Sequence, residues 1–284
     1  MAVEIDTKQI AQVQREVQTL YQTIFPQGSA AFVPEVFGWT HDYFTGKYHD
    51  YKPIDARYHD LEHTLQGTLC MAQLLRGWHL AKAQPSLTQR VFELGLLAIL
   101  LHDTGYLKKR GDNEGTGAKY TLIHVDRSRQ FAQELMGEKK FSASEIKSVQ
   151  NMICCTGVNV DISSIPFQSE VERRIGFALG TADLLGQMAA KDYIEKLPVL
   201  YSEFAEAARY DAGKARGSAA FNSAEDLLQK TPMFWEKYVQ TKIENDFQGV
   251  YRFLNDPYPD GQNYCIDRIE QNIHRLRRQL GKAA

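Results

Sequence analysis

The chain has 284 residues, of which 43% are hydrophobic and 24% charged, and its formal net charge is −2. The length suffices for one large domain or two small ones, and the near-neutral charge gives no strong nucleic-acid signal. The N-terminus has neither the cationic start nor the apolar stretch of a signal peptide, and no apolar run is long enough to span a membrane. Four cysteines are too few for a disulfide scaffold, so we expect reduced thiols and a cytoplasmic protein without membrane partners.

Apolar residues recur at spacings of three and four along most of the chain, which is the pattern of amphipathic helices. We find no convincing run of alternating apolar and polar residues that would predict a strand. The fold class predicted is therefore all-α. The expected helices lie at about residues 10–24, 61–77, 91–101, 120–136, 144–155, 170–197, 200–210, 232–254 and 262–280.

The segments between these helices carry the usual loop residues. Residues 32–56, rich in aromatics, Gly and Pro, are expected to be a connecting region, and 108–119 and 211–219 are expected to be glycine-containing loops. The helix at 91–101 ends in a nearly uninterrupted apolar run, which predicts burial on every side. Gly105 follows this helix at a position where a C-terminal cap is expected.

Histidine and aspartate recur within three of these apolar segments. His59 and His63 are four residues apart, so both imidazoles can face one cavity, although they could equally form a satisfied pair at a helix start. Asp103, after His102, ends a buried helix, where a carboxylate is costly to desolvate and lies at the negative pole of the dipole. A cation would offset both costs, and a salt bridge or hydrogen bond is the alternative. Asp183 raises the same question on a later helix. Two imidazoles and two carboxylates suit a divalent ion such as Zn, Mn, Fe, Co or Ni better than Ca.

The ordered set H…HD…D resembles the HD-domain superfamily of metal-dependent phosphohydrolases. The string YHD-x-x-H at 58–63 is similar to the YHN-x-x-H of cyclic-nucleotide phosphodiesterases, with Asp60 in place of Asn. The resemblance covers about residues 55–190 and implies an HD-domain helical bundle within a single domain. The flanking helices, expected to pack around this bundle, lie in residues 1–54 and 195–284.

The resemblance also implies roles for individual residues. A tightly held divalent ion would be bound by His63, His102, Asp103 and Asp183. The candidates for this ion are Zn, Mn, Fe, Co, Ni and Mg. Asp103 would bridge to a second, weaker ion, and the metals would generate hydroxide near neutral pH and bind phosphoryl oxygens. His59 would be the general acid that protonates the leaving oxygen. His124 would be a second-metal ligand or a phosphate contact, or simply a partly exposed helical histidine. Asp60 would orient a histidine from outside the ligand set.

Cations near these motifs are weaker candidates for contacts to a substrate phosphate. Lys108 and Lys109 follow the HD turn and Arg57 precedes His59, but each could belong to a solvated surface. The substrate expected is a small phosphomonoester or phosphodiester, with nucleotides among the candidates. Because Asp60 departs from the phosphodiesterase pattern, no cyclic-nucleotide specificity is inferred. The amphipathic terminal helices leave open whether the protein is a homodimer.

Two other functions fit parts of the pattern. The HD-fold di-iron oxygenases have the pattern H…HD…H…H…D, which includes a further histidine. This chain has Cys155 in the corresponding stretch, 151–156. Cys155 could be a soft ligand or a buried small thiol. A non-catalytic module that binds a metal or ligand is the third reading. The missing histidine favours the metal-dependent phosphoric ester hydrolase over the oxygenase.

Overall fold

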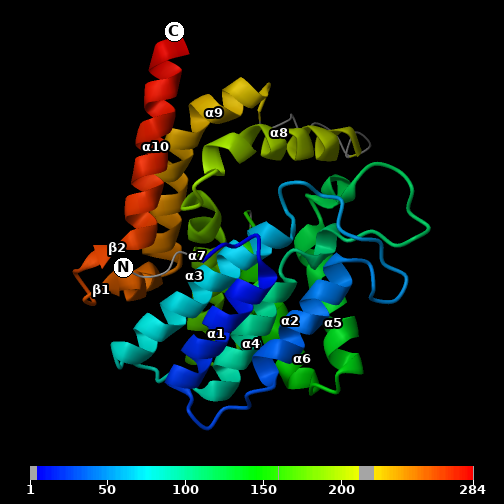
Figure 1. Cartoon of the computed structure of the whole chain (residues 1–284), viewed down its shortest axis with the longest axis vertical. Coiled ribbons are helices and arrows are strands. Elements are labelled where there is room, and N and C mark those ends of the chain that lie inside the picture. The colour runs from blue at the N-terminus through cyan, green and yellow to red at the C-terminus, as the bar shows by residue number, and fades with distance from the viewer. Residues whose placement is uncertain (1–4, 159, 211–220, 284) are drawn as a thin grey trace.

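The computed structural model describes residues 5–158, 160–210 and 221–283. These residues fold almost entirely into helices, which confirms the all-α prediction (Figure 1). The only sheet in the described ranges is a ladder of two-residue strands, β1 (Asn255–Asp256) and β2 (Gln262–Asn263). The α-helices are α1 (Ile10–Ile24), α2 (Phe32–Phe44), α3 (Leu61–Leu80), α4 (Gln89–Leu101), α5 (His124–Glu138), α6 (Ala143–Ile153), α7 (Glu170–Met188), α8 (Tyr193–Tyr210), α9 (Ala224–Met233) and α10 (Tyr264–Ala283).

The helices α3 and α7 form the most extensive helix pair of the bundle. Their backbones come close because Gly186 faces the Gln66 peptide, and a Cβ built on Gly186 would lie 2.8 Å from the Gln66 carbonyl oxygen. His63 lies about one turn before Gln66, and Asp183 lies about one turn before Gly186. The close approach therefore brings these two side chains to facing positions.

The helix α4 is buried along most of its length. Every residue from Phe92 to Leu101 is buried, as the apolar run predicted. The one carboxylate in this stretch, Glu93, accepts hydrogen bonds from Tyr21 (2.7 Å) and Arg90 (2.9 Å). Because α4 is fixed on all sides, the His102-Asp103 pair at its end has a fixed position.

The helices α8, α9 and α10 form an upper tier in Figure 1, above the bundle of α1 to α6. The helix α8 contacts both α9 and the short 3₁₀ helix η2 (Gly117–Tyr120). Its carboxylates reach two distant segments, since Glu203 binds the backbone of Arg57 and Tyr58 and Glu206 binds Thr116. No helix in the described ranges combines the length and apolar character required to cross a membrane.

The largest departure from the predicted elements is α2, which occupies part of the expected connecting region. Aromatic and Pro content suggested a loop, but Val33, Val36 and Phe37 lie on one buried face at helical spacing. Pro34 falls in the first turn, where its missing N–H is not needed. Packing of the apolar face against the bundle outweighs the composition of the segment.

Other helix boundaries also differ from expectation. The helix predicted over 170–197 breaks after Met188, and α8 restarts at Tyr193 with Pro198 inside it. The helix predicted over 232–254 is a series of short helices: η5 (Phe234–Val239) and η6 (Lys242–Asp246) are π-helical, and η7 (Val250–Leu254) is 3₁₀. The helix expected from 120 begins at His124. The predicted loop at 211–219 lies outside the described residues.

Two glycines expected to end helices serve close approaches instead. Gly105 lies in the 3₁₀ helix η1 (Thr104–Tyr106), and a Cβ there would be 2.0 Å from the carbonyl oxygen of His124. The helix α3 continues past Gly77 to Leu80, and a Cβ on Gly77 would be 1.7 Å from the carbonyl oxygen of Phe253.

We expect Gly77→Ala to lower the free energy of unfolding by about 1–3 kcal/mol, because η7 would have to move away from α3. Gly38→Ala is the matched control, since Gly38 also lies within a helix and a Cβ there meets nothing within 4 Å. The control should gain about 0.5–1 kcal/mol from its higher helix propensity. Urea denaturation measures both values. Equal stabilities for the two variants would contradict the close packing of α3 on η7.

Candidate metal centre

His63 is held by the start of α3. The N-cap residue is Asp60, whose carboxylate accepts the backbone N–H of His63 at 2.9 Å. Asp60 therefore positions this histidine through the backbone, whereas the sequence predicted that it would orient a histidine from outside the ligand set. Burial raises the pKa of Asp60, and the hydrogen bond from His63 opposes that rise.

His102 and Asp103 are fixed by the end of α4. His102 is the C-cap residue, and its Nδ1 donates to the carbonyl oxygen of Ile99 at 2.6 Å. In the neutral imidazole this hydrogen bond places the proton on Nδ1 and leaves a lone pair on Nε2. Asp103 follows directly, and it is only 2% exposed.

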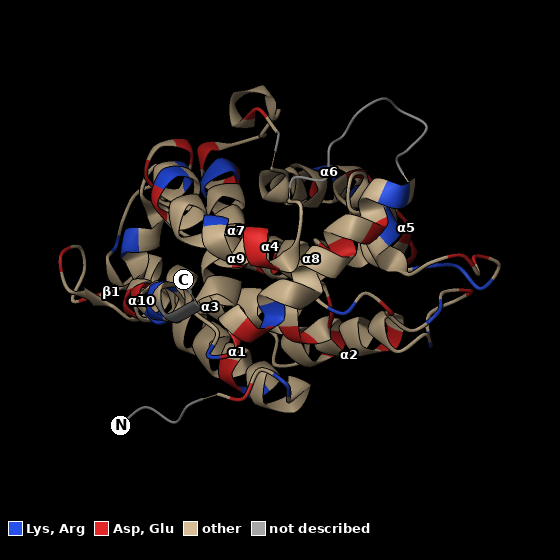
Figure 2. Ribbon diagram, turned by 90° about the horizontal axis from the view of Figure 1, so that it is seen from above, with Lys and Arg blue, Asp and Glu red and all other residues tan. Residues whose placement is uncertain are grey.

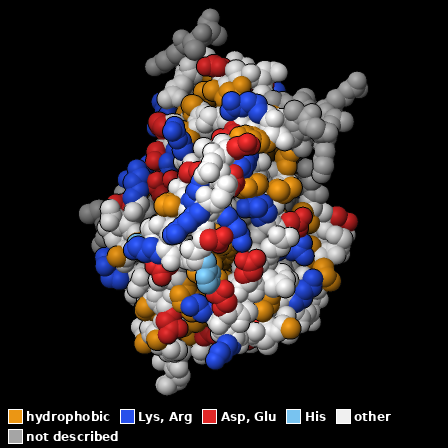
Figure 3. All heavy atoms as spheres, turned by 90° about the vertical axis from the view of Figure 1, so that its right-hand side faces the viewer, with side chains coloured by type: hydrophobic (Ala, Val, Ile, Leu, Met, Phe, Trp, Pro, Cys, Tyr) orange, Lys and Arg blue, Asp and Glu red, His pale blue; other side chains and the backbone are white. Residues whose placement is uncertain are grey.

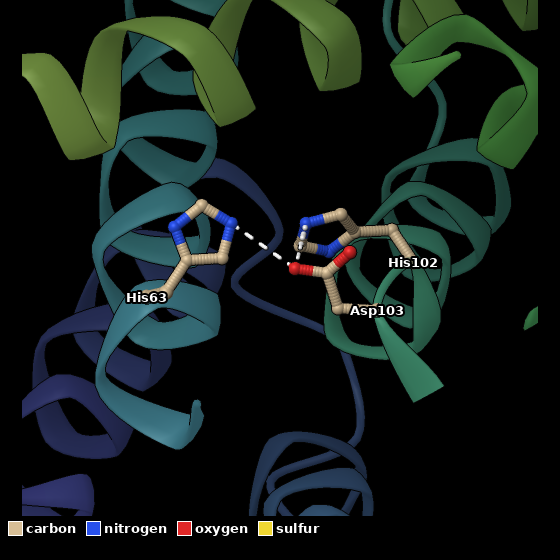
Figure 4. Close-up of side chains that lie close together, drawn as sticks. All are labelled: His63, His102 and Asp103. Carbon is tan, nitrogen blue, oxygen red and sulfur yellow. Dashed lines mark ion pairs between the residues drawn. The ribbon is translucent and has the colours of Figure 1, made fainter. Parts of the chain in front are cut away.

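Four side-chain atoms converge between α3, α4 and α7. The Nε2 atom of His63 lies 3.1 Å from Asp103 Oδ2 and 3.2 Å from Asp183 Oδ1. The Nε2 atom of His102 lies 3.2 Å and 3.4 Å from the same two oxygens. Figure 4 shows a ring nitrogen of His63, from α3, and one of His102, from the end of α4, both facing the same carboxylate oxygen of Asp103. His63, His102 and Asp103 also meet the spacing of a metal-binding group. The structure thus brings together all four residues predicted to hold the first ion.

The donor set fits a divalent cation. His102 Nε2 and Asp103 Oδ2 are buried and make no hydrogen bond within the described residues, although they are close to each other. Buried acceptors that face one another require a proton or a cation between them. Two imidazole nitrogens and two carboxylate oxygens suit borderline divalent metals.

Without a metal ion, protons on the two histidines neutralise the buried carboxylates. Burial lowers the pKa of His63, but the neighbouring carboxylates of Asp103 and Asp183 outweigh it and raise the pKa to about 9. For His102 the same carboxylates raise the pKa well above its usual value against the effect of burial. Burial raises the pKa of each aspartate, but the two histidines dominate and hold both values low.

His124 offers a second position next to the first. Its Nε2 lies 3.9 Å from Asp103 Oδ1, while its Nδ1 donates to the carbonyl oxygen of Thr121 at 2.6 Å. Burial lowers the pKa of His124, which favours the neutral form that binds metals. Asp103 therefore directs one oxygen toward His63 and His102 and the other toward His124, as a bridging carboxylate would.

His59 lies beside this group and is bound to a carboxylate that the sequence did not reveal. Its Nδ1 donates to Glu203 Oε2 at 2.6 Å, and Glu203 Oε1 accepts the backbone N–H groups of Arg57 and Tyr58, each at 2.7 Å. Burial raises the pKa of Glu203, but the hydrogen bonds from His59 and this backbone hold it below the usual value. Glu203 belongs to no motif and lies 144 residues from His59, so only the charged position on the buried face of α8 could have indicated it.

Two of the three cations predicted as phosphate contacts lie near carboxylates of the chain. Lys108 is 4% exposed, and its ammonium donates to Asp55 at 3.1 Å and to the carbonyl oxygen of Gly115. Lys109 lies over the Tyr51 ring, 4.0 Å from a carboxylate oxygen of Asp50. Arg57 contributes its backbone N–H to Glu203, and the residue itself is exposed. The ion pair with Asp55 is the arrangement that the sequence prediction for Lys108 missed.

Cys155 is part of the core. It is 1% exposed, and its sulfur would be 2.9 Å from a Cβ built on Gly176 of α7. Burial raises the pKa of the Cys155 thiol far above its usual value. A thiol this difficult to ionise is a poor metal ligand, because only the thiolate binds well.

We expect Asp103→Asn to weaken Mn²⁺ or Co²⁺ binding more than about 100-fold, since even partners outside a metal's own ligand set contribute about 10–100-fold to affinity. The matched control is Asp42→Asn, because the Asp42 side chain is 53% exposed on α2. Isothermal titration calorimetry measures both affinities. If both variants bind the ion as tightly as the wild type, the centre described above does not hold it.

We expect Glu203→Gln to lower the free energy of unfolding by about 1.5–3 kcal/mol near neutral pH, the value typical of hydrogen bonds to a charged group. The folded pKa of Glu203 lies below the ordinary 4.5, so its ionised form stabilises the fold above that pH and this stabilisation is lost as the pH falls through the folded value. The difference between wild type and variant should therefore be constant above about pH 5 and shrink below it.

Chemical denaturation across this pH range tests the Glu203 prediction. Glu195→Gln is the control on the same helix, because the Glu195 side chain is 54% exposed and pairs with Arg275. Such an exposed pair contributes little to stability. A wild-type advantage that stays constant down to pH 3 would mean that the Glu203 contribution does not depend on ionisation.

Comparison with known proteins gives one family assignment. A search of curated proteins finds no match to the chain. A sequence model described as Npun_R2479-like matches residues 110–256, slightly more than half of the chain. This region includes His124, Asp183 and Glu203, whereas His59, His63 and the His102-Asp103 pair precede it. The chain belongs to the Npun_R2479-like family.

Proposed function

We propose that the protein is a metal-dependent phosphohydrolase of the HD-domain type that cleaves a small phosphomonoester or phosphodiester. The observation that carries this proposal is the convergence of His63, His102, Asp103 and Asp183, whose facing atoms are 3.1–3.4 Å apart. The imidazoles can satisfy these buried carboxylates only as protonated donors, and a divalent ion would take the place of those protons.

The chain would hold a first divalent ion with these four residues and a second with Asp103 and His124. When bound, such ions supply Lewis acidity toward phosphoryl oxygens and a water of lowered pKa. The Ile99 carbonyl fixes the tautomer of His102, and the Thr121 carbonyl fixes that of His124. Both imidazoles are thereby ready to bind without a change of tautomer.

His59 is the residue suited to move a proton. Its Nδ1 is bound to Glu203 at 2.6 Å, which leaves Nε2 as the atom that can donate to a leaving oxygen. The Glu203 carboxylate accepts this hydrogen bond and fixes the orientation of the imidazole, as the carboxylate does in other acid-base pairs. With a side chain 15% exposed, His59 lies at the border between the centre and solvent.

The restricted access to the centre favours a small substrate. His63, His102 and Asp103 have side chains at most 5% exposed, whereas those of Asp183 and His124 are 13% and 17% exposed. Acidic and basic side chains are mixed over the ribbon in Figure 2 and over the face in Figure 3, so no surface of one sign is seen there to attract a charged polymer. The four free cysteines favour a reducing, cytoplasmic setting.

The chemistry of Cys155 argues against the oxygenase reading. The pattern of HD-fold di-iron oxygenases has a further histidine in this region. Here the corresponding residue is Cys155, a buried thiol of raised pKa that packs on α7. Asp103 directs its two oxygens toward unequal ligand sets, which suits one strong and one weak cation. A binding module without turnover would share these features, and it is separated from the hydrolase by activity.

We expect the purified protein to hydrolyse p-nitrophenyl phosphate or bis-p-nitrophenyl phosphate when supplied with Mn²⁺, Ni²⁺ or Co²⁺. Asp103→Asn should lower kcat/KM at least about a thousandfold, because several kcal/mol of transition-state stabilisation are lost. Asp42→Asn should leave the rate unchanged. Two bound irons with an oxygen-dependent reaction would replace the hydrolase by the oxygenase, and metal binding without turnover on any phosphoester would favour the module.

We expect His59→Asn to lower kcat by about 10²–10⁴, the usual contribution of a general acid, without changing metal affinity. We expect an effect on kcat alone because His59 binds Glu203 and lies outside the group of four converging atoms. Steady-state kinetics and metal titration on the same preparation measure both. A loss of metal binding in His59→Asn would make His59 a ligand and not the acid.

A further inference from the structure

The ring of Tyr106 lies against both histidines that flank the first metal position. Its centroid is 4.4 Å from that of His59, with planes 11° apart, and 4.8 Å from that of His124, with planes 22° apart. The two imidazole centroids are 6.3 Å apart, much closer than rings on opposite faces of Tyr106 would be. The three rings therefore form a compact triangle, here called the ring triangle, in which the two imidazoles share Tyr106 as a neighbour.

Each imidazole of the ring triangle is bound at Nδ1 by one hydrogen bond, and of its ring contacts the one with Tyr106 is the closest and the most nearly parallel. The hydrogen bonds at Nδ1 go to Glu203 for His59 and to the Thr121 carbonyl for His124, each at 2.6 Å. Because each ring is joined to the chain at Cβ and bound at Nδ1, the freedom that remains is a limited rotation of its plane. The flat face of Tyr106 limits this rotation, and so it fixes the direction in which each Nε2 points.

Tyr106 itself is rigidly held. Its side chain is buried, with the residue 1% exposed, and its backbone N–H donates to the carbonyl oxygen of Asp103 at 3.1 Å. On the other side, a Cβ on Gly117 would be 2.0 Å from the Tyr106 carbonyl oxygen, so the backbones of η1 and η2 are in close contact. The ring is thereby tied to Asp103 by three residues of tightly wound chain.

We propose that Tyr106 is a positioning residue whose ring holds His59 and His124 at a fixed separation and orientation. The inference rests on the proposed function and adds a residue to it. In phosphoryl transfer the attacking and leaving oxygens lie roughly in line on opposite sides of phosphorus. The proton donor and the second cation position must therefore keep separate places. Without the ring, both imidazoles could turn, and His59 could approach the cation position that His124 serves.

The test compares three variants at this position. Tyr106→Phe keeps the ring and removes the hydroxyl, whereas Tyr106→Met keeps an unbranched apolar side chain without a ring, and Tyr106→Leu is a second non-aromatic variant if Met proves unstable. Circular dichroism establishes folding. Mn²⁺ titration followed by the electron paramagnetic resonance of free Mn²⁺ measures the two affinities, and kcat is measured on the phosphoester that the wild type hydrolyses best.

We expect Tyr106→Phe to stay within about threefold of wild type in kcat and in both Mn²⁺ affinities. The non-aromatic variants should keep the first Mn²⁺ site, bind the second about tenfold more weakly, and lose about 100-fold in kcat, the scale of a displacement of about 1 Å. An unchanged second site and kcat in Tyr106→Met or Tyr106→Leu would overturn the proposal. So would an equal loss in Tyr106→Phe, which would assign the effect to the hydroxyl.

The same measurements separate this inference from the proposed function. If the wild type hydrolyses no phosphoester, the phosphohydrolase proposal fails, and the Mn²⁺ titrations still decide whether the Tyr106 ring positions His124. If the wild type binds only one Mn²⁺, the His124 part of the proposal is wrong. In ¹⁵N-histidine spectra of the metal-free protein, loss of the ring should shift the His59 and His124 signals and leave that of exposed His49 unchanged. Unchanged His59 and His124 signals would overturn the ring triangle directly.

Discussion

The hydrogen bond from His102 Nδ1 to the Ile99 carbonyl determines what the rest of the centre must supply. It turns a lone pair on Nε2 toward two carboxylates inside a nearly closed space, and three electron-rich atoms cannot remain there unneutralised. Protons or a cation have to bind, and the high pKa of His63 is one expression of this demand. A sequence that needed only a stable core would have placed apolar residues at these positions, because His63, His102 and Asp103 are buried.

Part of the candidate ligand group stands out in the sequence because His102-Asp103 and Asp183 interrupt strong local patterns, and the resemblance to the HD pattern supplied the full set. An apolar run that ends in His102-Asp103, or an apolar helix face that contains Asp183, is an anomaly visible without coordinates. The all-α class follows in the same way from periodicity. The distances among the side chains do not follow, because they depend on the close packing of α3 on α7 at Gly186, which no local pattern encodes.

What sequence reasoning missed consists of contacts between distant segments. Glu203 belongs to no motif, and although it interrupts the buried face of α8, only the fold places it beside His59. Lys108 appeared to be a phosphate contact from its position after the HD turn, but the fold supplies Asp55 as its partner. The helix α2 was hidden by aromatic residues and Pro34, although its buried face has ordinary helical spacing. Composition describes solvent and loop preferences, whereas burial is decided by tertiary packing.

The separation between His59 and Glu203 has a consequence for synthesis of the chain. The two residues are 144 positions apart, so at usual rates of translation roughly 10–30 s pass between their appearances. During that interval the backbone N–H groups of Arg57 and Tyr58 and the Nδ1 atom of His59 have no carboxylate to bind. The bundle of α1 to α7 can pack first, but the His59 end of the centre is completed only when α8 has left the ribosome. A nascent chain would thus bring His63, His102, Asp103 and Asp183 together before His59 meets the carboxylate that fixes its orientation.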